Sequence, residues 1–401
     1  MGRLYLAIAA FGFLIAAISA ADARQSSAAK GAVAQRSVPR PAAYIVVDAD
    51  SGMVLGQREA DRVWYPASVT KLMTAYLTFQ ALKTGRLKLT SPVIETAEAL
   101  VAPPTRMGFA VGTSMTLDSA LKMMLVHSAN DIAVAISQTV GGSEAKFVAE
   151  MNTTAHSLGM SSTHYDNPNG LPSPGQLTTA RDLAVLARAI MIKFPEFRGY
   201  FRIQAIKAGG QILRSQNALL ERYPGATGMK TGFICDSGFN MVASATRNGR
   251  TLIAVVLGAP TALSRAELAA KLLNVGFSGG SFGFTRVELA SFHPGASMGP
   301  AINLHNSICG SHRVHPSEAD ADVGDIRSAL GPPITTRPPV VVSTGVSDPA
   351  VIAKAEMSVG VNVDAAPLQS KESTAVPFPR LRKERMVTDP TLKARFAADF
   401  E

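Results

Sequence analysis

Two short apolar runs near the start of the chain have the pattern of a β-hairpin. They occupy residues 44–47 and 53–55 and flank a turn-rich segment at residues 48–52. Apolar runs of this length on either side of turn residues predict two antiparallel strands. We therefore expect the folded region to begin with a hairpin, after a flexible leader at residues 24–40.

Helical patterns dominate the next part of the chain. From residue 68 to about residue 84 the apolar positions are so dense that they predict a buried helix. Gly85 follows this stretch, and glycine readily adopts the left-handed conformation that ends a helix. Four further helices are expected at residues 117–126, 131–140, 144–158 and 180–193, with a loop rich in proline and glycine at residues 167–179.

Three strand patterns then follow in succession, at residues 228–233, 238–247 and 251–259. Asn248-Gly249, a strong signal for a two-residue hairpin turn, joins the last two, and a final helix is expected at residues 264–275. This order predicts an α+β fold, in which a five-stranded antiparallel sheet takes strands from both ends of the domain and a helical lobe is inserted between them. Ligand sites favour the cleft between such lobes.

The pattern weakens after about residue 277. Residues 278–401 contain proline pairs and segments rich in serine, threonine and aspartate, without clear periodicity. This composition predicts a mostly disordered or loosely ordered tail. Within it, residues 338–343 are compatible with one strand, and residues 391–400 with a frayed helix or, alternatively, a weak membrane contact.

The N-terminal segment indicates export. Arg3 precedes an apolar stretch that ends in the small residues Ala21-Asp22-Ala23. This pattern predicts a signal peptide at residues 1–23, with an uncleaved anchor as the alternative. We expect the mature protein in the periplasm or cell envelope.

Composition narrows the range of partners and cofactors. The 401 residues carry a formal net charge of +9, but no basic patch with interleaved aromatic residues is present, so nucleic acid is not an expected partner. The seven histidines and two cysteines show no metal-site spacing, so neither a metal nor another cofactor is expected. In an oxidising compartment Cys235 and Cys309 either form a disulfide or remain free thiols.

Ser68 and Lys71 are the first candidates for catalysis. They stand three residues apart at the start of the first predicted helix and so share one face. A serine is a weak nucleophile that needs a base, and a neighbouring lysine can serve as one. Two other Ser-x-x-Lys pairs, at residues 27–30 and 143–146, fit a structural interpretation, because one lies in the leader and the other begins a helix with its serine as N-cap.

Two further motifs follow in order. Ser128-Ala129-Asn130 lies on a predicted connection between helices, and Lys230-Thr231-Gly232 opens a predicted strand. The order Ser-x-x-Lys, Ser-x-Asn, Lys-Thr-Gly is the signature of the penicillin-recognising serine enzymes. An earlier copy, Lys83-Thr84-Gly85, ends a helix before Ser128 and cannot complete this order.

With these motifs the chain resembles the low-molecular-mass penicillin-binding proteins, the serine-type D-alanyl-D-alanine carboxypeptidases of peptidase family S11. The resemblance covers about residues 41–277 and is carried by "YPASVTKLMTAYL", "HSANDIAVAI", "DNPNGLPSPGQLTTARDLA", "GMKTGFICDSGFNMVASA" and "SRAELAAKLLNVGF". It implies a β-lactamase/transpeptidase-like fold for this domain, peptidoglycan stem peptides as substrates and β-lactam antibiotics as covalent inhibitors.

The resemblance also implies roles for four catalytic residues. Ser68 would be the acylated nucleophile and Lys71 its general base. Ser128 and Asn130 would line the cleft, where they would shuttle a proton and hold the substrate amide.

The other implied residues would bind substrate. Lys230 would supply positive charge, and Thr231 and Arg265 would receive the terminal carboxylate, although Arg265 is alternatively an exposed helix residue. Gly232 would let the substrate backbone lie against the strand. Backbone N–H groups of the nucleophile and of Phe233 would form the oxyanion hole.

Other activities are compatible with the same motifs, namely those of a D,D-transpeptidase and a D,D-endopeptidase. A β-lactamase is less favoured, because no glutamate lies between Glu150 and Glu196 to activate water. A catalytically dead wall-binding protein is least favoured, because every expected motif residue is present. We therefore expect a secreted hydrolase, a serine-type D-Ala-D-Ala carboxypeptidase that removes the terminal D-alanine from stem peptides.

Overall fold

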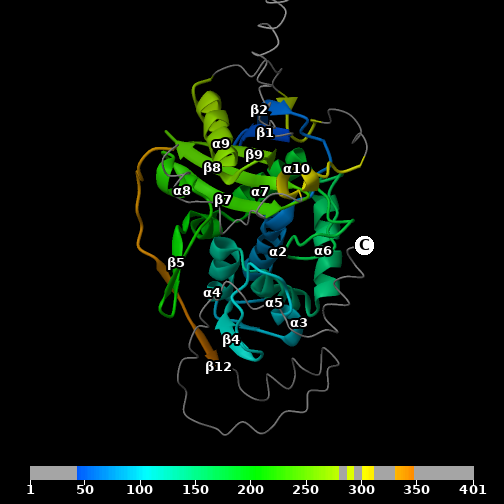
Figure 1. Ribbon diagram of the computed structural model, residues 1–401, viewed down its shortest axis with the longest axis vertical. Coiled ribbons are helices and arrows are strands. Elements are labelled where there is room, and N and C mark those ends of the chain that lie inside the picture. Colours follow the sequence, from blue (N-terminus) through cyan, green and yellow to red (C-terminus); the bar gives the residue numbers. More distant parts are fainter. Residues whose placement is uncertain (1–42, 280–286, 293–299, 311–329, 347–401) are drawn as a thin grey trace, which may run out of the picture. The chain divides into compact units, whose positions relative to one another are not determined.

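The computed structural model describes residues 43–279, 287–292, 300–310 and 330–346 (Figure 1). The predicted signal peptide, the leader and the expected C-terminal helix lie outside these ranges and stay predictions. Within them, no helix is both long and apolar enough to cross a bilayer.

An antiparallel sheet forms one layer of the domain. Its strands are β1 (Ala43–Asp48), β2 (Met53–Arg58), β7 (Ala226–Ile234), β8 (Gly238–Arg247), β9 (Arg250–Ala259) and β10 (Val287–Glu288). Their order is β10-β2-β1-β9-β8-β7, so the N-terminal hairpin pairs with the last of the three later strands. The expected hairpin and three successive strands are confirmed. The expected count of five is wrong, because the tail adds β10 to the outer edge of β2.

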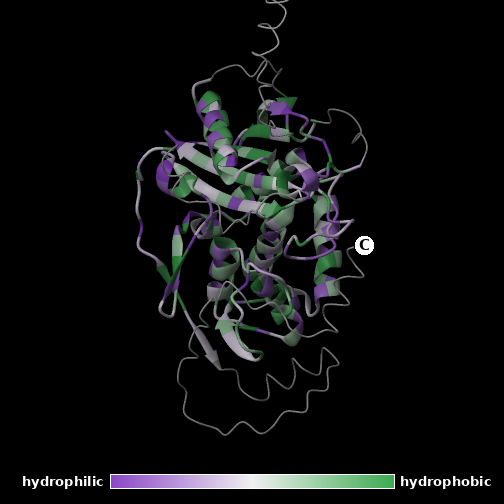
Figure 2. Ribbon diagram, in the orientation of Figure 1, coloured by the Kyte–Doolittle hydropathy of each residue, from purple (hydrophilic) through white to green (hydrophobic). Residues whose placement is uncertain are grey.

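Helices cover both faces of this sheet. α9 (Ala262–Phe277) packs on one face and α7 (Ala180–Lys193) on the other. Successive side chains of β9 point to opposite faces of the sheet. On one face Leu252, Ala254 and Val256 pack with α9. On the other face Ile253, Val255 and Leu257 belong to the second hydrophobic core. A strand buried on both faces is apolar without alternation, as the sequence of β9 is. Figure 2 shows α9 itself with hydrophilic and hydrophobic residues side by side, as expected of a helix with one exposed face.

The helical lobe is built around α2 (Lys71–Lys83), most of whose residues are buried (Figure 1). The expected helix from residue 68 divides into a 3₁₀ turn, η1 (Ala67–Thr70), and α2. Around α2 stand α3 (Ala97–Leu100), α4 (Leu117–Lys122), the π-helical turn η2 (Met123–His127), α5 (Asn130–Gly141), α6 (Glu144–Ser157) and η3 (Pro195–Arg202). The ring of Phe79 packs against a cluster of aromatic rings from and beside η3, namely Phe194, Phe197, Tyr200 and Phe201. A helix enclosed in this way needs no polar face, which explains its dense apolar sequence.

Two small sheets, apart from their strand β11, and several short helices were not expected from the sequence. β3 (Pro92–Ile94), β4 (Thr113–Thr116) and β12 (Thr344–Val346) form one sheet, and β5 (Ala205–Ala208), β6 (Gln211–Arg214) and β11 (Val340–Val342) form the other. One of these helices is α8 (Leu219–Arg222). Elements of three or four residues are too short to display a hydrophobic period, so pattern reasoning passes over them.

Parts of the tail therefore belong to the folded domain. The strand expected within residues 338–343 is confirmed as β11, which lies parallel to β5. β12 pairs antiparallel with β4, and α10 (His305–Cys309) also lies in the tail. The loose order expected for residues 278–401 stays a prediction for the residues outside the described ranges.

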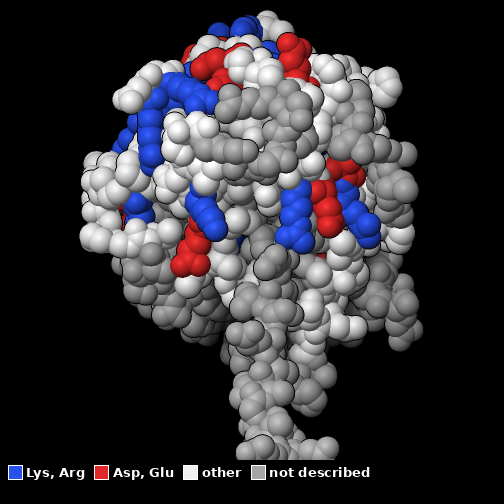
Figure 3. Space-filling model, turned by 90° about the horizontal axis from the view of Figure 1, so that it is seen from above, with Lys and Arg blue, Asp and Glu red and all other residues white. Residues whose placement is uncertain are grey.

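Charged side chains of both signs share the surface. On the face seen in Figure 3, lysine and arginine side chains stand beside aspartate and glutamate side chains. Ion pairs of this kind join Arg250 to Asp48 at 2.6 Å and Arg214 to Glu221 at 3.2 Å. Exposed pairs contribute little to stability, about 0–1 kcal/mol each, which applies to Arg214–Glu221 more than to the pair of the buried Asp48.

Candidate active site

Ser68, Lys71 and Asn130 meet in one hydrogen-bonded group. Lys71 is fully buried, and its Nζ donates to Ser68 Oγ at 2.8 Å, to Asn130 Oδ1 at 2.7 Å and to the backbone oxygen of Asn169 at 2.7 Å. Three acceptors match the three N–H donors of a protonated lysine, and an unprotonated lysine would keep two of these bonds and turn its lone pair toward Ser68 Oγ. At 2.8 Å a proton can pass directly between the lysine nitrogen and the serine oxygen. The structure thus places the first predicted pair within reach of each other.

The backbone around Ser68 is held by the central sheet. Asn240 of β8 is buried, and its Nδ2 donates to the backbone oxygens of Tyr65 and Pro66 at 2.9 and 3.1 Å. Trp64, also buried, donates from Nε1 to the backbone oxygen of Ser237 at 2.9 Å. These bonds fix the approach to η1, so Ser68 stands on a turn that is held on the sheet side. Sequence reasoning missed Asn240, because only its pairing with Gly232 across the sheet brings it near the segment before Ser68.

Gly232 brings β7 against the same turn. A Cβ atom at this position would lie 2.8 Å from the backbone nitrogen of Ser68 and 2.9 Å from that of Val69. Real Cβ contacts essentially never become this short, so β7 can approach η1 this closely only with glycine there. The role expected from the sequence was contact with the substrate backbone. That role stays a prediction, and the structure adds a second reason for glycine, the close approach of the turn that carries Ser68.

Ser128 and Lys230 form a second hydrogen-bonded pair. Lys230 Nζ donates to Ser128 Oγ at 2.8 Å and to the backbone oxygen of Thr231 at 2.9 Å, and all three residues are about 3% exposed. The π-helical turn η2 ends at Ser128, whose φ of 66° is left-handed. Turns of this type are frequent at functional sites. They re-aim the side chain that follows, here toward the strand that carries Lys230.

His127 lies next to this pair. Burial and the nearby charge of Lys230 lower the pKa of His127 to about 4. The imidazole is therefore neutral at neutral pH. It adds no positive charge beside Lys230.

A loop fixes the orientation of the Asn130 amide. Asn130 donates from its backbone nitrogen to the oxygen of Thr105 at 2.7 Å and from Nδ2 to the oxygen of Pro103 at 2.9 Å. With Nδ2 engaged, Oδ1 faces Lys71. The loop is tied back to α5 by Asp131, whose Oδ2 accepts from the backbone nitrogen of Gly108 at 2.7 Å.

Two buried carboxyl groups lie beside this loop, those of Asp131 and Glu95. Burial raises the pKa of Asp131, and burial together with the charge of Asp131 raises the pKa of Glu95 to about 9. Glu95 is therefore protonated and uncharged at neutral pH. Sequence reasoning missed both residues. The position of Asp131 directly after the Ser-x-Asn motif, in the first turn of a helix, could have drawn attention to it.

The loop predicted at residues 167–179 reaches Lys71 and the turn that carries Ser68. It is fastened by Thr74, which donates to the backbone oxygen of Pro168 at 2.6 Å, and by Gln176, which donates to Thr70 Oγ1 at 2.9 Å. Gly170 has a left-handed φ of 87°, and a Cβ there would lie 1.9 Å from the backbone oxygen of Ala67. The loop thereby delivers the Asn169 carbonyl to Lys71, a contact that the sequence did not reveal.

Arg265 is buried, so the alternative of an exposed helix residue is wrong. Its Nη1 donates to the backbone oxygen of Asn240 at 3.2 Å and lies 3.5 Å from that of Gly232. The guanidinium also lies 5.5 Å from the ring centre of Phe239. α9 thus holds a positive charge against the paired strands β7 and β8, at Gly232 and Asn240. Phe233, the other expected contributor, is half-buried and stacks on Phe239 at 4.2 Å.

The competing motif copies have structural roles. Lys83 donates to the backbone oxygen of Lys193, Thr84 is the C-cap of α2, and Gly85 takes a left-handed φ of 75°. Ser143 is the expected N-cap, with its Oγ 3.3 Å from the backbone nitrogen of Lys146. The Ser-x-x-Lys pair at residues 27–30 lies outside the described residues.

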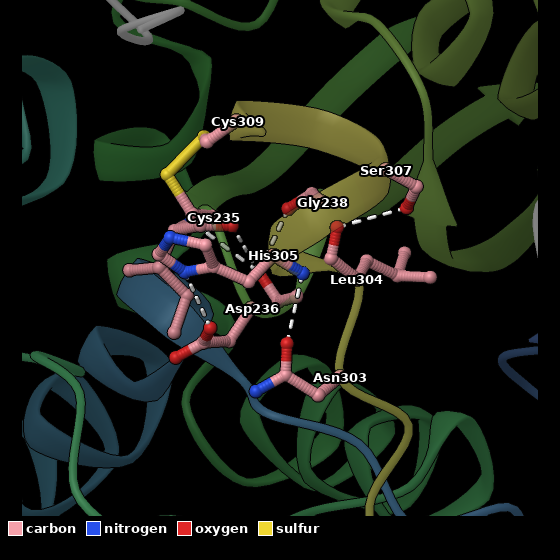
Figure 4. The surroundings of a disulfide bond; sticks show 10 residues. Cys235, Asp236, Gly238, Asn303, Leu304, His305, Ser307 and Cys309 are labelled. Atoms are coloured by element: carbon pink, nitrogen blue, oxygen red, sulfur yellow. Dashed lines mark hydrogen bonds and ion pairs between the residues drawn. A yellow bond between two sulfur atoms is a disulfide. The ribbon is translucent and has the colours of Figure 1, made fainter. Parts of the chain in front are cut away.

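Cys235 and Cys309 form a disulfide, with their Cα atoms 5.6 Å apart (Figure 4). Cys235 lies in the turn between β7 and β8, and Cys309 ends α10. Of the two alternatives left open by the sequence, the structure contains the bonded pair. Sequence separation is 74 residues, so only the folded chain brings the two cysteines together.

Comparison with protein families identifies the domain. The model of the family Peptidase_S11, D-alanyl-D-alanine carboxypeptidase, matches residues 31–261. The chain belongs to this family. The match contains the motifs around Ser68, Ser128 and Lys230, whereas Arg265 and α10 lie beyond its end.

Individual relatives agree with the family. The chain is 36% identical over 242 residues to D-alanyl-D-alanine carboxypeptidase DacC of Escherichia coli (strain K12), which covers 59% of this chain and 60% of that protein. It is 32% identical over 240 residues to D-alanyl-D-alanine carboxypeptidase DacF of Bacillus subtilis (strain 168), covering 58% and 61%. The chain thus spans about three fifths of the length of these relatives.

Solved structures show the same fold. Penicillin binding protein 5 from Haemophilus influenzae superposes with a TM-score of 0.58 at 32% identity, covering 59% of this chain and 71% of that one. A point mutant of the Streptomyces K15 DD-transpeptidase gives a TM-score of 0.55 at 29% identity, covering 60% and 99%. The sheet with its inserted helical lobe is therefore the penicillin-binding and transpeptidase fold expected from the sequence.

Proposed function

We propose that this protein is a serine-type D-alanyl-D-alanine carboxypeptidase. It removes the terminal D-alanine from peptidoglycan stem peptides through an acyl-enzyme at Ser68, and penicillin acylates the same serine. The observation that carries the proposal is the 2.8 Å contact between Lys71 Nζ and Ser68 Oγ, in a group that includes Asn130. A serine beside an amine base is the arrangement that nucleophilic acyl transfer requires.

Acylation begins when Ser68 Oγ attacks the carbonyl carbon of the penultimate D-alanine. The hydroxyl proton passes to the unprotonated amine of Lys71, 2.8 Å away, as the new C–O bond forms. The tetrahedral intermediate then collapses with cleavage of the C–N bond. The leaving amine keeps the bonding electrons and takes the proton that Lys71 accepted, relayed through the hydroxyl of Ser128, which Lys230 polarises at 2.8 Å; Lys71 is then unprotonated again.

Deacylation repeats these steps with water. Water attacks the ester carbon and gives a proton to Lys71, the C–O bond to Ser68 breaks, and the serine oxygen regains its proton. The shortened peptide leaves as a carboxylate. Asn169 and Asn130 keep Lys71 in place through both halves of the reaction, because each accepts a hydrogen bond from its Nζ at 2.7 Å.

Binding uses the edge of β7. Lys230, Thr231 and the buried Arg265 supply positive charge and a hydroxyl for the terminal carboxylate of the substrate. The carbonyl oxygen lies between the backbone N–H groups of Ser68 and Phe233, which stabilise the oxyanion. Since Gly232 abuts the Ser68 turn, both N–H groups belong to one rigid unit.

A D,D-transpeptidase is the second candidate, because a DD-transpeptidase is among the similar solved structures. A D,D-endopeptidase would use the same acyl-enzyme. The observations favour a β-lactamase less. No glutamate occurs among residues 151–195, and the loop at 167–179 offers Lys71 a backbone carbonyl instead.

The place of action follows from the substrate. A peptidoglycan peptidase works in the cell envelope, which agrees with the predicted signal peptide at residues 1–23. The disulfide between Cys235 and Cys309 also favours an oxidising compartment. We therefore propose export to the periplasm or cell envelope, with stem peptides and β-lactams as partners.

The deciding experiment incubates the protein with a pentapeptide that ends in D-Ala-D-Ala, with and without an amine acceptor. Release of D-alanine without crosslinked product supports the carboxypeptidase, and substantial crosslinked product would select the transpeptidase. Fluorescent penicillin should label the wild-type protein and leave Ser68→Ala unlabelled. A wild-type protein that is neither labelled nor active would reject catalysis altogether.

A further inference from the structure

A segment of the tail is fastened to the turn that ends β7. We name residues 300–310, which contain α10, the cysteine strap. Its Cys309 is bonded to Cys235, and the backbone nitrogen of Leu304 donates to the backbone oxygen of Asp236 at 2.8 Å. His305 Nδ1 lies 2.9 Å from Asp236 Oδ1 (Figure 4). The disulfide, the backbone bond and the side-chain contact together fix the strap to one turn.

The strap also packs against the domain through Leu304. A Cβ atom at Gly238 would lie 3.2 Å from Leu304 Cδ1, and Leu304 also packs against the core that contains Trp64. Trp64 bonds to Ser237 of the same turn and stands four residues before Ser68. The strap, the turn and the nucleophilic segment are therefore one connected structure. His305 and Asp236 remain partly exposed, with side chains 53% and 26% accessible.

The proposed function gives the substrate a direction along β7. The terminal carboxylate belongs near Thr231, and the reacting carbonyl lies between Ser68 and Phe233. The part of the peptide that becomes the acyl group must then continue on the other side, along Ile234 toward the turn at Cys235. An extended chain beside a strand edge pairs with it residue by residue.

The strap lies within reach of that acyl chain. From Gly232 to Cys235 is three strand residues, about 10 Å at the rise of a β-strand. An extended peptide advances by about 3.3–3.6 Å per residue, so its third residue before the scissile bond arrives at the level of the turn. A peptide with a single residue on the acyl side ends well before it.

We propose that the cysteine strap is a specificity element. Together with the Asp236 turn it forms a wall that contacts the third residue of the substrate, counted back from the scissile bond. The enzyme therefore favours long stem peptides over short ones. The proposal rests on the proposed function. His305 and Asp236 are the contacting side chains, since both are accessible at this wall. The disulfide keeps them in position. The strap lies beyond the family match, so this wall belongs to the tail of this chain.

The test compares two substrates on the full chain. One is a pentapeptide ending in D-Ala-D-Ala, the other N-acetyl-D-Ala-D-Ala, and released D-alanine gives kcat/KM for each. His305→Ala should lower the pentapeptide-to-dipeptide ratio of kcat/KM about fivefold, equivalent to about 1 kcal/mol of lost contact. The double variant Cys235→Ser/Cys309→Ser should lower the ratio in the same direction, because the wall is no longer fastened.

Ser307→Ala is the matched control. Ser307 lies on α10 but points away from His305, with its hydroxyl bonded to the backbone oxygen of Leu304 (Figure 4). It should leave the ratio unchanged, and penicillin labelling verifies that each variant is folded at the site. If His305→Ala is active and its pentapeptide-to-dipeptide ratio of kcat/KM equals that of the wild type, the inference is overturned and the proposed function stands. A wild-type protein that releases no D-alanine and takes no penicillin would reject the proposed function, and the inference with it.

Discussion

The chain contains the tripeptide Lys-Thr-Gly twice, in opposite surroundings. Lys83-Thr84-Gly85 is exposed at the end of α2, where glycine terminates the helix. Lys230-Thr231-Gly232 is buried in β7, where the lysine faces Ser128 and the glycine abuts the Ser68 turn. The same three residues thus end a helix in the first copy and belong to the candidate active site in the second. The difference lies wholly in what each copy touches.

Lys230→Ala should have the largest effect on activity. It removes the charge beside Ser128, so we expect kcat/KM to fall about 10²- to 10³-fold, the usual loss for one electrostatic donor at a reacting group. Lys83→Ala is the matched control and should leave the rate of penicillin acylation unchanged. Stopped-flow acylation of both variants provides the measurement. Equal losses in the two would show that the copies do not differ in function.

Gly232→Ala should come next. Its Cβ would lie 2.8 Å from the Ser68 nitrogen, so the strand or the turn must shift. A displacement of this kind near the reacting atoms costs about 10²-fold in acylation rate.

Gly85→Ala provides the contrast, because nothing lies within 4 Å of its Cβ position. Its left-handed φ makes alanine unfavourable by about 1–2 kcal/mol, so the melting temperature should fall while acylation stays normal. Thermal unfolding combined with penicillin labelling measures both effects. Loss of acylation in Gly85→Ala at a temperature where it is folded would contradict the structural role.

Asp131→Ala tests the loop that orients Asn130. It removes the acceptor that ties Gly108 to α5, which frees the loop that orients Asn130. We expect kcat to fall about tenfold with a smaller change in KM, because Asn130 is misplaced rather than lost. Asp131→Asn keeps one acceptor and should recover part of the rate. Full activity in Asp131→Ala would remove the residue from the positioning network.

Glu95→Gln should leave activity unchanged but alter the pH dependence of stability. The folded-state pKa of Glu95 is about 9, above the ordinary value of 4.5, so between these pH values the folded protein keeps a proton that the unfolded chain has lost. Stability contributed by the neutral carboxyl is therefore present at low pH and lost as the pH rises through this range. The glutamine variant should show a smaller fall in unfolding free energy between about pH 5 and pH 8 in urea titrations. Identical slopes for the two proteins would mean that Glu95 is charged in the folded state.

Much of the fold could be predicted because its elements are long and periodic. β8, β9, α6 and α7 match their predicted ranges within one residue at each end. The small strands β3 to β6 could not be found, since three or four residues show no period. β10, β11 and β12 belong to a tail with little sequence pattern, so their pairing depends on edges that the folded domain offers.

The candidate site divides in the same way. Ser68, Lys71, Ser128, Asn130 and Lys230 were found from motif order alone, because the chemistry requires those residue types. Asn169, Asn240 and Asp131 were missed, since a backbone carbonyl or a supporting amide can come from many residue types. Arg265 was left between two interpretations until its burial excluded the exposed one.

The sequence by itself determined the family resemblance, the candidate site residues and the order of the main elements, since these depend on residue identity and local period. Only the tertiary structure decided that Lys230 lies within 2.8 Å of Ser128 and that the Asn169 carbonyl reaches Lys71. It also decided that Cys235 and Cys309 are bonded and fasten a piece of the tail beside β7. The physical reason is that these contacts join residues up to 102 positions apart, and local preferences carry no information about such distances.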